Sequence, residues 1–527
     1  MNPAYYRVRV LLDVCHSFLL PIALVHLVLF WFELALPRIQ LVLIYVGSVV
    51  LCSAAKTFYN DLTQCRELRQ HLRPIPRVVG RWPGNLDILL RMMKDFKTSY
   101  VLDVYLQLFK EYQCTTLNLR ILWRDCQQHC SHRLYILSTA PCHVLIHTTL
   151  DHIHGSRPYQ IRPGNRVWAL LERSCAERTI VRIFGNGTVH ETQGSQPFRE
   201  TFLGSGIFNR DDDDWKEHRA IARPFFARDR IEDFDNFETH TARTLSILTS
   251  LASTQEAFDA QDLYSRFTLD SASEFLFGKN LDTLSQSRPI PGQTVMGPKG
   301  SAVEGDWGSF AKAFETAQIN ATTRARIGHW WPLLELFKDK NAEHADVIHR
   351  WLDPLVQRAL NERTQRIGRK RADSKASLGT SFLKHIAECV DDPVTIRDQL
   401  LNMLLASRDT TATVLTFLTY LLATHPDVTD RLRAEILEHV GPTSHPFPDT
   451  LKQLKYLRAV LNETMRLYPP VPLNIRETRS ASCTLPPSDP TYASSDTRPF
   501  YMPAKTIIIA IPLCGVKTPK NSFPNAG

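Results

Sequence analysis

The stretch VLNETMRLYPPVPLNIRET, residues 460–478, places a carboxylate and a guanidinium three positions apart within a largely apolar run. Glu463 and Arg466 therefore share one face of a predicted helix, which a pair of prolines ends. An exposed pair of this kind contributes only about 0.3–0.5 kcal/mol to stability. We therefore expect the pair to be buried and to fix the geometry of the next segment of the chain. Arg476 then comes on a segment that we expect to be extended.

Most of the remaining chain has helical periodicity. Apolar residues recur at three- and four-residue steps in 86–112, 231–280, 306–318, 344–362 and 395–424. The best strand candidates are 499–503 and 506–513. No repeat with a period of about 20–50 residues is present, which argues against a solenoid. The sequence therefore predicts a mainly α fold with a minor β-sheet.

The composition is that of a folded protein. Of the 527 residues, 43% are hydrophobic and 22% are charged. The net charge of +8 is diffuse, and we expect no nucleic-acid partner. The densest basic run, 363–371, is interpreted as a solvated loop or helix end rather than a nuclear signal. The 11 scattered cysteines indicate free thiols in a reducing compartment.

Two apolar stretches near the N-terminus predict a membrane anchor. The first, 17–36, contains one charge and has about the ~20 residues that a bilayer span needs. The second, 39–55, is near the lower limit, and arginines lie on the outer flanks of both stretches. This pattern fits two spans with both ends cytosolic, or one span plus a segment lying in the membrane surface. A cleaved signal is disfavoured, and the Pro-rich segment 73–85 is predicted to lead stiffly to the soluble body.

Residues 126–183 differ from their surroundings because histidine and cysteine are concentrated in them. One interpretation is a zinc site, with ligands supplied by Cys126, Cys130, His143 and His147. The alternative, which we favour, is an aberrant segment foreign to the fold, such as non-coding sequence read through in the gene model. The spacing matches no zinc pattern that we can justify physically.

A polar cluster interrupts the apolar helix predicted over 400–426. Arg408, Asp409 and Thr410 follow Ser407 in its middle. Hydroxyls there bond to carbonyls one turn earlier, and a carboxylate in an apolar wall is costly unless it has a partner or a purpose. The alternative is that Arg408 and Asp409 form an outward-facing polar strip.

Another cluster lies in DDDDWKEHRAIARPFF, residues 211–226. Four aspartates begin a predicted helix, where the helix dipole favours negative charge. Trp215 and Arg219 share one face at i, i+4, and together an indole N–H and a guanidinium can hold carboxylates or a phosphate. The Gly-x-Gly motifs in FGNGT (184–188) and FLGSG (202–206) lack a preceding strand, so we do not expect them to bind a nucleotide.

In order and rough spacing, these motifs resemble those of the cytochromes P-450, membrane-anchored heme-thiolate monooxygenases. WKEHR resembles the tryptophan helix, ASRDTTA the oxygen-binding helix and ETMR the Glu-x-x-Arg helix. The stretches FTLDSASEFLFG, RLYPPVPLNIRET and FYMPAKT look like fungal members that oxidise n-alkanes and fatty acids. The resemblance covers about 57–125 and 184–506.

The resemblance implies a role for each motif. Thr410 would donate a hydrogen bond to bound dioxygen, with Asp409 helping to relay protons. Trp215, Arg219 and Arg476 would bind the propionates of heme b, iron protoporphyrin IX. Glu463 and Arg466 would be the buried pair that locks the fold beneath the heme. Ser407 stands where the family most often has glycine, so the oxygen groove would be slightly narrower.

The expected iron ligand is a cysteine in Phe-x-x-Gly-x-Arg-x-Cys-x-Gly, and no such motif occurs in the sequence. Cys514 lacks the preceding residues of that motif, so we expect no protein ligand for the metal. We therefore expect a C-terminal truncation, in the gene model or in a pseudogene product. Two functions stay open: a monooxygenase acting on an alkane, a fatty acid or a hydrophobic xenobiotic, and a non-catalytic membrane protein without heme.

The resemblance also implies partners and a location. We expect electrons from NADPH through NADPH-cytochrome P-450 reductase, a small lipophilic substrate, and an endoplasmic reticulum membrane with the body facing the cytosol. The expected regions are a membrane anchor over 1–56, a Pro-rich linker and the start of the body over 57–125, the aberrant segment 126–183, and a truncated helical body over 184–527.

Overall fold

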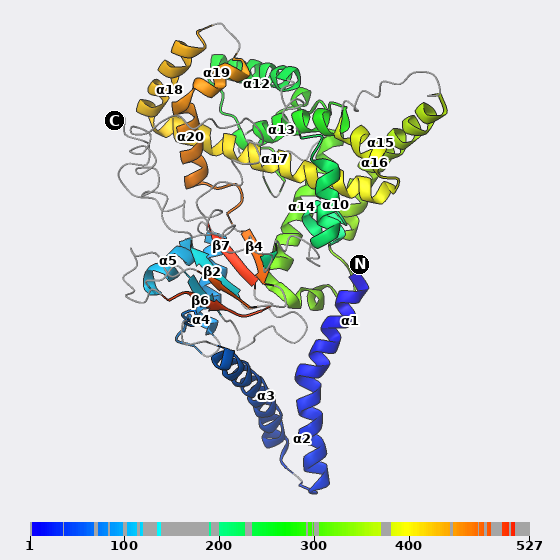
Figure 1. Cartoon of the computed structure of the whole chain (residues 1–527), viewed down its shortest axis with the longest axis vertical. Coiled ribbons are helices and arrows are strands. Elements are labelled where there is room, and N and C mark those ends of the chain that lie inside the picture. The colour runs from blue at the N-terminus through cyan, green and yellow to red at the C-terminus, as the bar shows by residue number, and fades with distance from the viewer. Residues whose placement is uncertain are drawn as a thin grey trace.

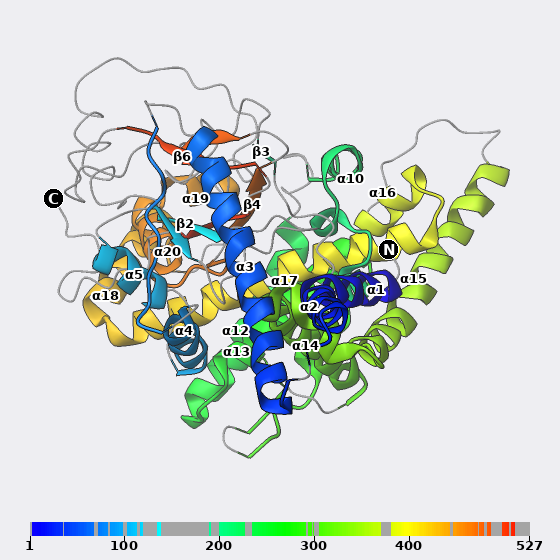
Figure 2. The ribbon, with the colours of Figure 1, turned by 90° about the horizontal axis from the view of Figure 1, so that it is seen from below.

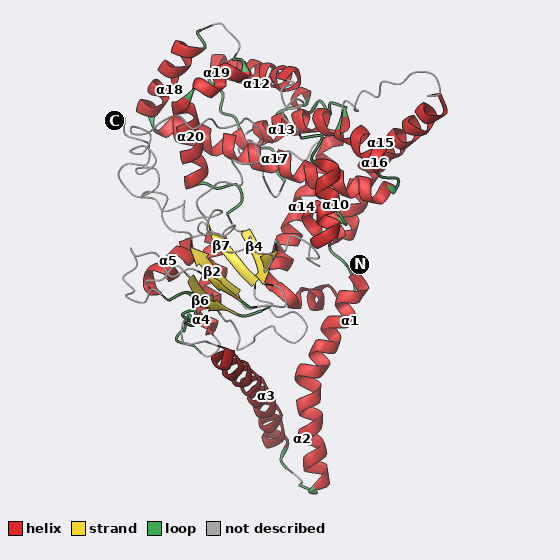
Figure 3. Ribbon diagram, in the orientation of Figure 1, coloured by secondary structure: helices red, strands yellow, loops and turns green. Residues whose placement is uncertain are grey.

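The computed structural model describes residues 3–34, 36–67, 72–82, 85–98, 103–112, 116–119, 134–138, 189–190, 200–226, 234–290, 293–297, 299, 305–369, 381–442, 446–472, 474–478, 482–485, 498–504 and 507–511. Helices dominate this part of the chain, and the strands gather in one region beneath the helical body (Figure 3). The predicted mainly α fold with a minor sheet is therefore confirmed.

The helical elements in chain order are α1 (Pro3–Val14), η1 (Cys15–Leu19), α2 (Leu20–Trp31), α3 (Arg38–Glu67), α4 (Leu86–Thr98), α5 (Asp103–Tyr112), α9 (Glu200–Leu203), η3 (Ile207–Asn209), α10 (Asp212–Ala222), α12 (Phe234–Thr254), α13 (Ala260–Phe277), η4 (Thr283–Ser285), α14 (Gly305–Ile327), η5 (Gly328–Glu335), α15 (Ala342–Arg369), α16 (Phe382–Cys389), α17 (Pro393–Thr424), α18 (Pro426–His439), α19 (Pro448–Gln453) and α20 (Lys455–Leu467).

An apolar helical hairpin projects from the body (Figure 1). Its two arms contain the candidate spans Val10–Trp31 and Arg38–Ala55, both long and apolar enough to cross a bilayer. The first lies earlier than the predicted 17–36, because the helix ends at Trp31 and the chain turns with Glu33 at a φ of 50°. The two spans agree with the anchor expected from the sequence.

The hairpin meets the body at two places. At one end α1 packs against η5, and Val10 is buried there with 1% of its surface exposed. The other arm, α3, leads toward residues 72–82 and α4. Viewed from below, α1 and α2 are seen nearly end on, while α3 crosses the picture (Figure 2). Within the hairpin, His26 Nδ1 lies 2.7 Å from the Tyr45 hydroxyl and joins α2 to α3.

The long helix α17 is the centre of the body (Figure 1). Asp392 caps its start by accepting hydrogen bonds from the Thr395 backbone N–H at 2.9 Å and the Val394 N–H at 3.3 Å. Proline at the first helical position suits this start, and the next proline, Pro426, begins α18 immediately after α17 ends. Helices α13, α15, α16, α18 and α20 all pack on α17. The core shared by α13, α15, α16 and α17 is rich in leucine and phenylalanine. Helices α18 and α20 pack on α17 through a separate, smaller cluster that contains Val428, Leu432 and Val460.

The larger sheet has the strand order β1–β2–β7–β4–β3. Its strands are β1 (Thr116–Leu119), β2 (Leu134–Ser138), β3 (Val189–His190), β4 (Asn474–Thr478) and β7 (Ile507–Ile511). Only β2 and β7 pair in parallel; the other described pairs are antiparallel. A second sheet pairs β5 (Cys483–Leu485) with β6 (Phe500–Met502). The two predicted strands are therefore present as β6 and β7, but in different sheets.

The histidine- and cysteine-rich segment 126–183 is described only at Leu134–Ser138. This strand, β2, lies between β1 and β7. The proposed zinc ligands lie outside the described residues, as does Cys514. The zinc site and the aberrant segment both stay predictions, and so do the four expected regions.

Candidate functional site

The hydroxyl–acid pair lies in the middle of α17. Thr410 Oγ1 donates a hydrogen bond to the Ala406 carbonyl at 2.6 Å, and Ser407 Oγ donates to the Met403 carbonyl at 2.8 Å. Both bonds follow the i to i−4 pattern expected for hydroxyls within a helix. The Thr410 side chain is half-buried. While its hydroxyl donates this bond, the oxygen can still accept a hydrogen bond from another group.

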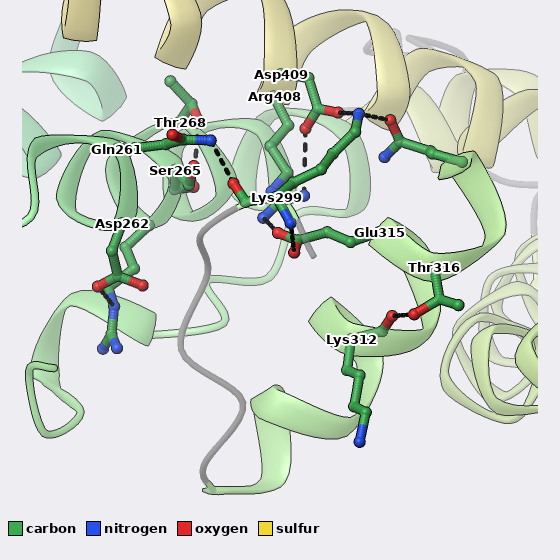
Figure 4. A network of polar contacts seen from close by, with 12 residues as sticks. Gln261, Asp262, Ser265, Thr268, Lys299, Lys312, Glu315, Thr316, Arg408 and Asp409 are labelled. Atoms are coloured by element: carbon green, nitrogen blue, oxygen red, sulfur yellow. Dashed lines mark hydrogen bonds and ion pairs between the residues drawn. The ribbon is translucent and has the colours of Figure 1, made fainter. Parts of the chain in front are cut away.

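Asp409 is held by cations on two sides (Figure 4). Its carboxylate lies 3.1 Å from Lys299 Nζ and 3.2 Å from Arg408 Nη1. Burial acts to raise the pKa of Asp409, but the charges of Arg408 and Lys299 and hydrogen bonds from Lys299 and Gln318 outweigh it. The pKa therefore lies below the ordinary aspartate value, and the group is ionised at neutral pH.

A more deeply buried ion pair lies beside the contacts of Asp409. Arg408 Nη2 lies 3.2 Å from Glu315 Oε1, and the two side chains are 3% and 1% exposed. Glu315 also accepts a hydrogen bond from the Lys299 backbone N–H at 2.9 Å. The amine of Lys299 bonds Gln318 as well, so a loop residue links α14 to α17. Since Arg408 is buried, the alternative of an outward-facing polar strip is wrong.

Sequence reasoning did not find Lys299 or Glu315. Lys299 lies in a Pro/Gly-rich stretch of the sequence, 287–304, where neither periodicity nor a motif singles out one lysine. Glu315 lies within a stretch that was correctly predicted to be helical, but a glutamate in a helix is ordinary until its partner is known. The position of Arg408 in the middle of an otherwise apolar helix was the signal in the sequence that an acidic partner exists.

The tryptophan and arginine of α10 lie together as predicted. The Arg219 guanidinium carbon lies 5.4 Å from the centre of the Trp215 ring, within cation–π range. Trp215 also packs on the core formed by α13 to α17. The aspartates stand at the start of α10, where Asp213 pairs with Lys216 at 2.9 Å in solvent. One face of α10 therefore presents an indole and a guanidinium side by side.

The predicted ion pair is present and largely buried. Arg466 Nε and Nη2 donate to the two carboxylate oxygens of Glu463 at 2.6 Å each, and the side chains are 13% and 14% exposed. Helix α20 carries this pair and packs on α17, where the Phe417 and Tyr468 rings stack with centres 4.1 Å apart. A bidentate geometry of this kind is the strong form of an arginine–carboxylate bond.

Arg476 lies in β4, opposite Ile508 of β7, which confirms the predicted extended segment. Its side chain is outside the described part of the structure. Helix α17 thus carries Asp409 and Thr410 and contacts the helix of Glu463 and Arg466. Among the described contacts, none joins Trp215 or Arg219 directly to Thr410 or to β4. The roles of the seven residues named from the sequence remain predictions.

Comparison with known proteins gives a family and a set of fungal relatives. The family model for Cytochrome P450 matches residues 185–489. Cytochrome P450 monooxygenase himC of Aspergillus japonicus is 37% identical over 287 residues, which cover 54% of this chain and 48% of that protein.

Two Candida proteins are similarly related. Cytochrome P450 52A3-A of Candida maltosa is 35% identical over 300 residues, 54% of this chain and 53% of the relative. Cytochrome P450 52E1 of Candida apicola is 38% identical over 277 residues, 52% of this chain and 50% of the relative. The chain therefore spans about half of the length of the curated relatives that it matches.

Proposed function

Since the chain belongs to the cytochrome P450 family, we propose that it functions as a membrane-anchored, heme-dependent monooxygenase. It would insert one atom of O2 into a lipophilic substrate such as an n-alkane, a fatty acid or a hydrophobic xenobiotic. A flavoprotein reductase would deliver electrons from NADPH. The observation that carries this proposal is the ionised Asp409 beside the Thr410 hydroxyl in the middle of α17.

The described donor groups fit a heme. Its two propionates need N–H donors and positive charge, and α10 offers the Trp215 indole and the Arg219 guanidinium on one face. We propose Arg476, in β4, as a third propionate partner. The buried Glu463–Arg466 pair would lock the chain beneath the cofactor, because it fixes the end of α20 just before β4.

When bound, the heme would supply the centre at which O2 binds and is reduced. The protein side chains would hold and move the protons. Thr410 Oγ1 donates a hydrogen bond to the Ala406 carbonyl, and a rotation about its Cβ–Oγ1 bond would turn that proton into the site. Asp409 is kept as a carboxylate by Lys299 and Arg408, so it can accept a proton and pass it on.

A second candidate is a P450-like membrane protein that binds no heme and is not catalytic. Its body would keep the buried ion pairs, which need no cofactor.

The carbon-monoxide difference spectrum of the reduced, full-length chain in detergent separates the two candidates. A Soret band at the position typical of a thiolate ligand supports the monooxygenase. No heme absorbance after reconstitution with hemin supports the non-catalytic alternative. Turnover of an alkane or a fatty acid with NADPH and a reductase then tests the substrate class.

The location is also a proposal. The two candidate spans and the return of both arms to one body support an anchor with the body on one side of the bilayer. We propose the endoplasmic reticulum with the body facing the cytosol. Protease treatment of intact microsomes should digest the body, whereas protection of the body would contradict this orientation.

A further inference from the structure

The Gly-x-Gly segment FLGSG lies directly on the polar side of α17. It forms the turn between α9 and η3, and this turn is bonded to helix residues about 190–200 positions later in the sequence. Asp398 Oδ2 accepts hydrogen bonds from the Ser205 backbone N–H at 2.8 Å and from its hydroxyl at 3.0 Å. Gln399 Oε1 accepts from the Ile207 N–H at 3.3 Å.

Asn402 is the centre of this contact. Its Oδ1 accepts from the Phe208 backbone N–H at 2.9 Å, and its Nδ2 donates to the Leu203 carbonyl at 2.9 Å. Nδ2 also donates to the Asp398 carbonyl at 2.7 Å, which holds the amide in one orientation. Asn402 is fully buried, so the backbone groups that it bonds have no water to replace it.

The glycines permit this close approach. A Cβ on Gly206 would overlap the Asn402 amide and would lie 2.7 Å from the Asp398 carbonyl oxygen. Gly204 has a φ of 55°, and a Cβ there would overlap the Asp398 carboxylate. The Gly-x-Gly spacing is therefore explained by packing against α17.

The same turn fixes the start of α10. Only residues 210 and 211 separate η3 from α10. Asn209 is fully buried and bonds the Gly204 carbonyl at 2.9 Å, which closes the turn. The far end of α10 is held separately, because His385 Nε2 of α16 lies 2.8 Å from the Ile221 carbonyl. Helix α10 is thus attached to its neighbours at both ends.

The attachment and the hydroxyl–acid pair share one helix. Asp398, Asn402 and Asp409 follow at steps of four and seven residues, which places them along one stripe of α17. Asn402 and Asp409 are about 10 Å apart along the helix axis. A rigid helix therefore sets the distance between the start of α10 and Asp409.

We propose that Asp398, Gln399 and Asn402 are positioning residues that hold the 203–208 turn against α17 and so place Trp215 and Arg219 for the cofactor. The part that concerns heme rests on the proposed function. The part that concerns α10 does not, because the hydrogen bonds exist without a cofactor.

The test combines amide hydrogen exchange with heme affinity, on the full chain in detergent micelles. Asn402→Ala leaves the Phe208 N–H and the Leu203 carbonyl buried and unpaired. We expect amide exchange in peptides covering 203–222 to become about tenfold faster. Exchange in α18 and α20 should not change. Hemin titration should show about tenfold weaker binding, with a shifted Soret band.

Two further variants sharpen the test. Gly206→Ala pushes the turn away from α17 without removing a polar group, and it should reproduce the local change in exchange if Asn402→Ala folds poorly. Asn361→Ala makes the same chemical change as Asn402→Ala at an exposed position of α15, and it should alter neither readout.

The outcomes separate the two claims. Exchange that rises equally in α18 and α20, or that does not rise in 203–222, overturns the attachment. Faster local exchange with unchanged heme affinity overturns the role in cofactor placement. If the unsubstituted chain binds no heme, the proposed function and the cofactor role both fail, while the exchange data still decide whether α17 holds α10.

Discussion

The amine of Lys299 lies 3.1 Å from Oδ2 of Asp409, although 110 residues separate them in the sequence. This contact gives the acid in α17 a cation that the helix itself does not supply. Because Lys299 also bonds Glu315 and Gln318 of α14, the loop, α14 and α17 meet at one carboxylate. The lowered pKa of Asp409 therefore depends partly on a residue outside its own helix.

Lys299→Ala should raise the pKa of Asp409, because one of the two nearby cations is lost. The Asp409 pKa is lowered in the folded chain, so its contribution to stability is present above the ordinary aspartate pKa and is lost as pH falls through the folded-state value. The substitution should lower the free energy of unfolding by about 0.5 kcal/mol at pH 7, because the lysine is partly exposed. The loss should be smaller in acid.

Chemical denaturation of the Lys299→Ala chain at several pH values measures this effect. Lys312→Ala is the matched control, because Lys312 is an exposed lysine of the neighbouring helix α14. A loss of stability that is the same at every pH would show that Lys299 acts only by packing.

Arg408→Met should lower the free energy of unfolding far more than Lys299→Ala. It leaves Glu315, only 1% exposed, without its arginine, and breaking a buried pair costs about 3–5 kcal/mol. Adding Glu315→Leu should recover much of this loss, because two apolar side chains replace the two charges. Unfolding free energies of the single and double variants measure the coupling. A double variant no more stable than Arg408→Met would contradict it.

Thr410→Val tests the proposed proton role. It removes the hydroxyl but keeps the shape, so product formation should fall by about 100-fold or more while stability changes little. Thr413→Val is the control, because Thr413 makes the equivalent bond to the Asp409 carbonyl at 2.7 Å. Equal losses in both variants would indicate a general effect of hydroxyls on α17 instead.

Asp398→Asn should alter the pH dependence of stability in the opposite sense from Asp409. Burial raises the pKa of Asp398, although Ser205 and Arg397 act against the shift. Its contribution to stability is complete below the ordinary aspartate pKa and is lost as pH rises through the folded-state value. Asparagine carries no charge at any pH.

Thermal unfolding of the Asp398→Asn chain measures this effect. The melting temperature of the variant minus that of the unsubstituted chain should increase between about pH 4 and pH 7. A difference that is constant across that range would show that the Asp398 proton does not affect folding.

Local patterns predicted much of the fold. The recurrence of apolar residues predicted the start of α17 to within two residues, because an amphipathic or buried helix repeats its apolar pattern along its own sequence. The Glu463–Arg466 pair was also local, since residues three apart on a helix are neighbours. The two strand candidates were also right, because the residue types that favour a strand follow one another in a short local run.

Long-range contacts could not be predicted in this way. The sequence indicated β6 and β7 but not that they join different sheets, because strand pairing depends on distant segments. The contacts of Lys299 with Asp409 and of the 203–208 turn with Asn402 are equally non-local. A glycine spacing that resembled a nucleotide motif proved to be a packing requirement.

The two-armed hairpin has a mechanical consequence for the body. A single tether allows a protein to rotate freely about its stalk, but here α1 is fixed against η5 while α3 joins the chain elsewhere. Swivelling above the bilayer would have to break the α1–η5 contact. If the two candidate spans cross a bilayer as proposed, the same surface of the body would face the lipid, and a hydrophobic molecule leaving the membrane would approach the body from one side.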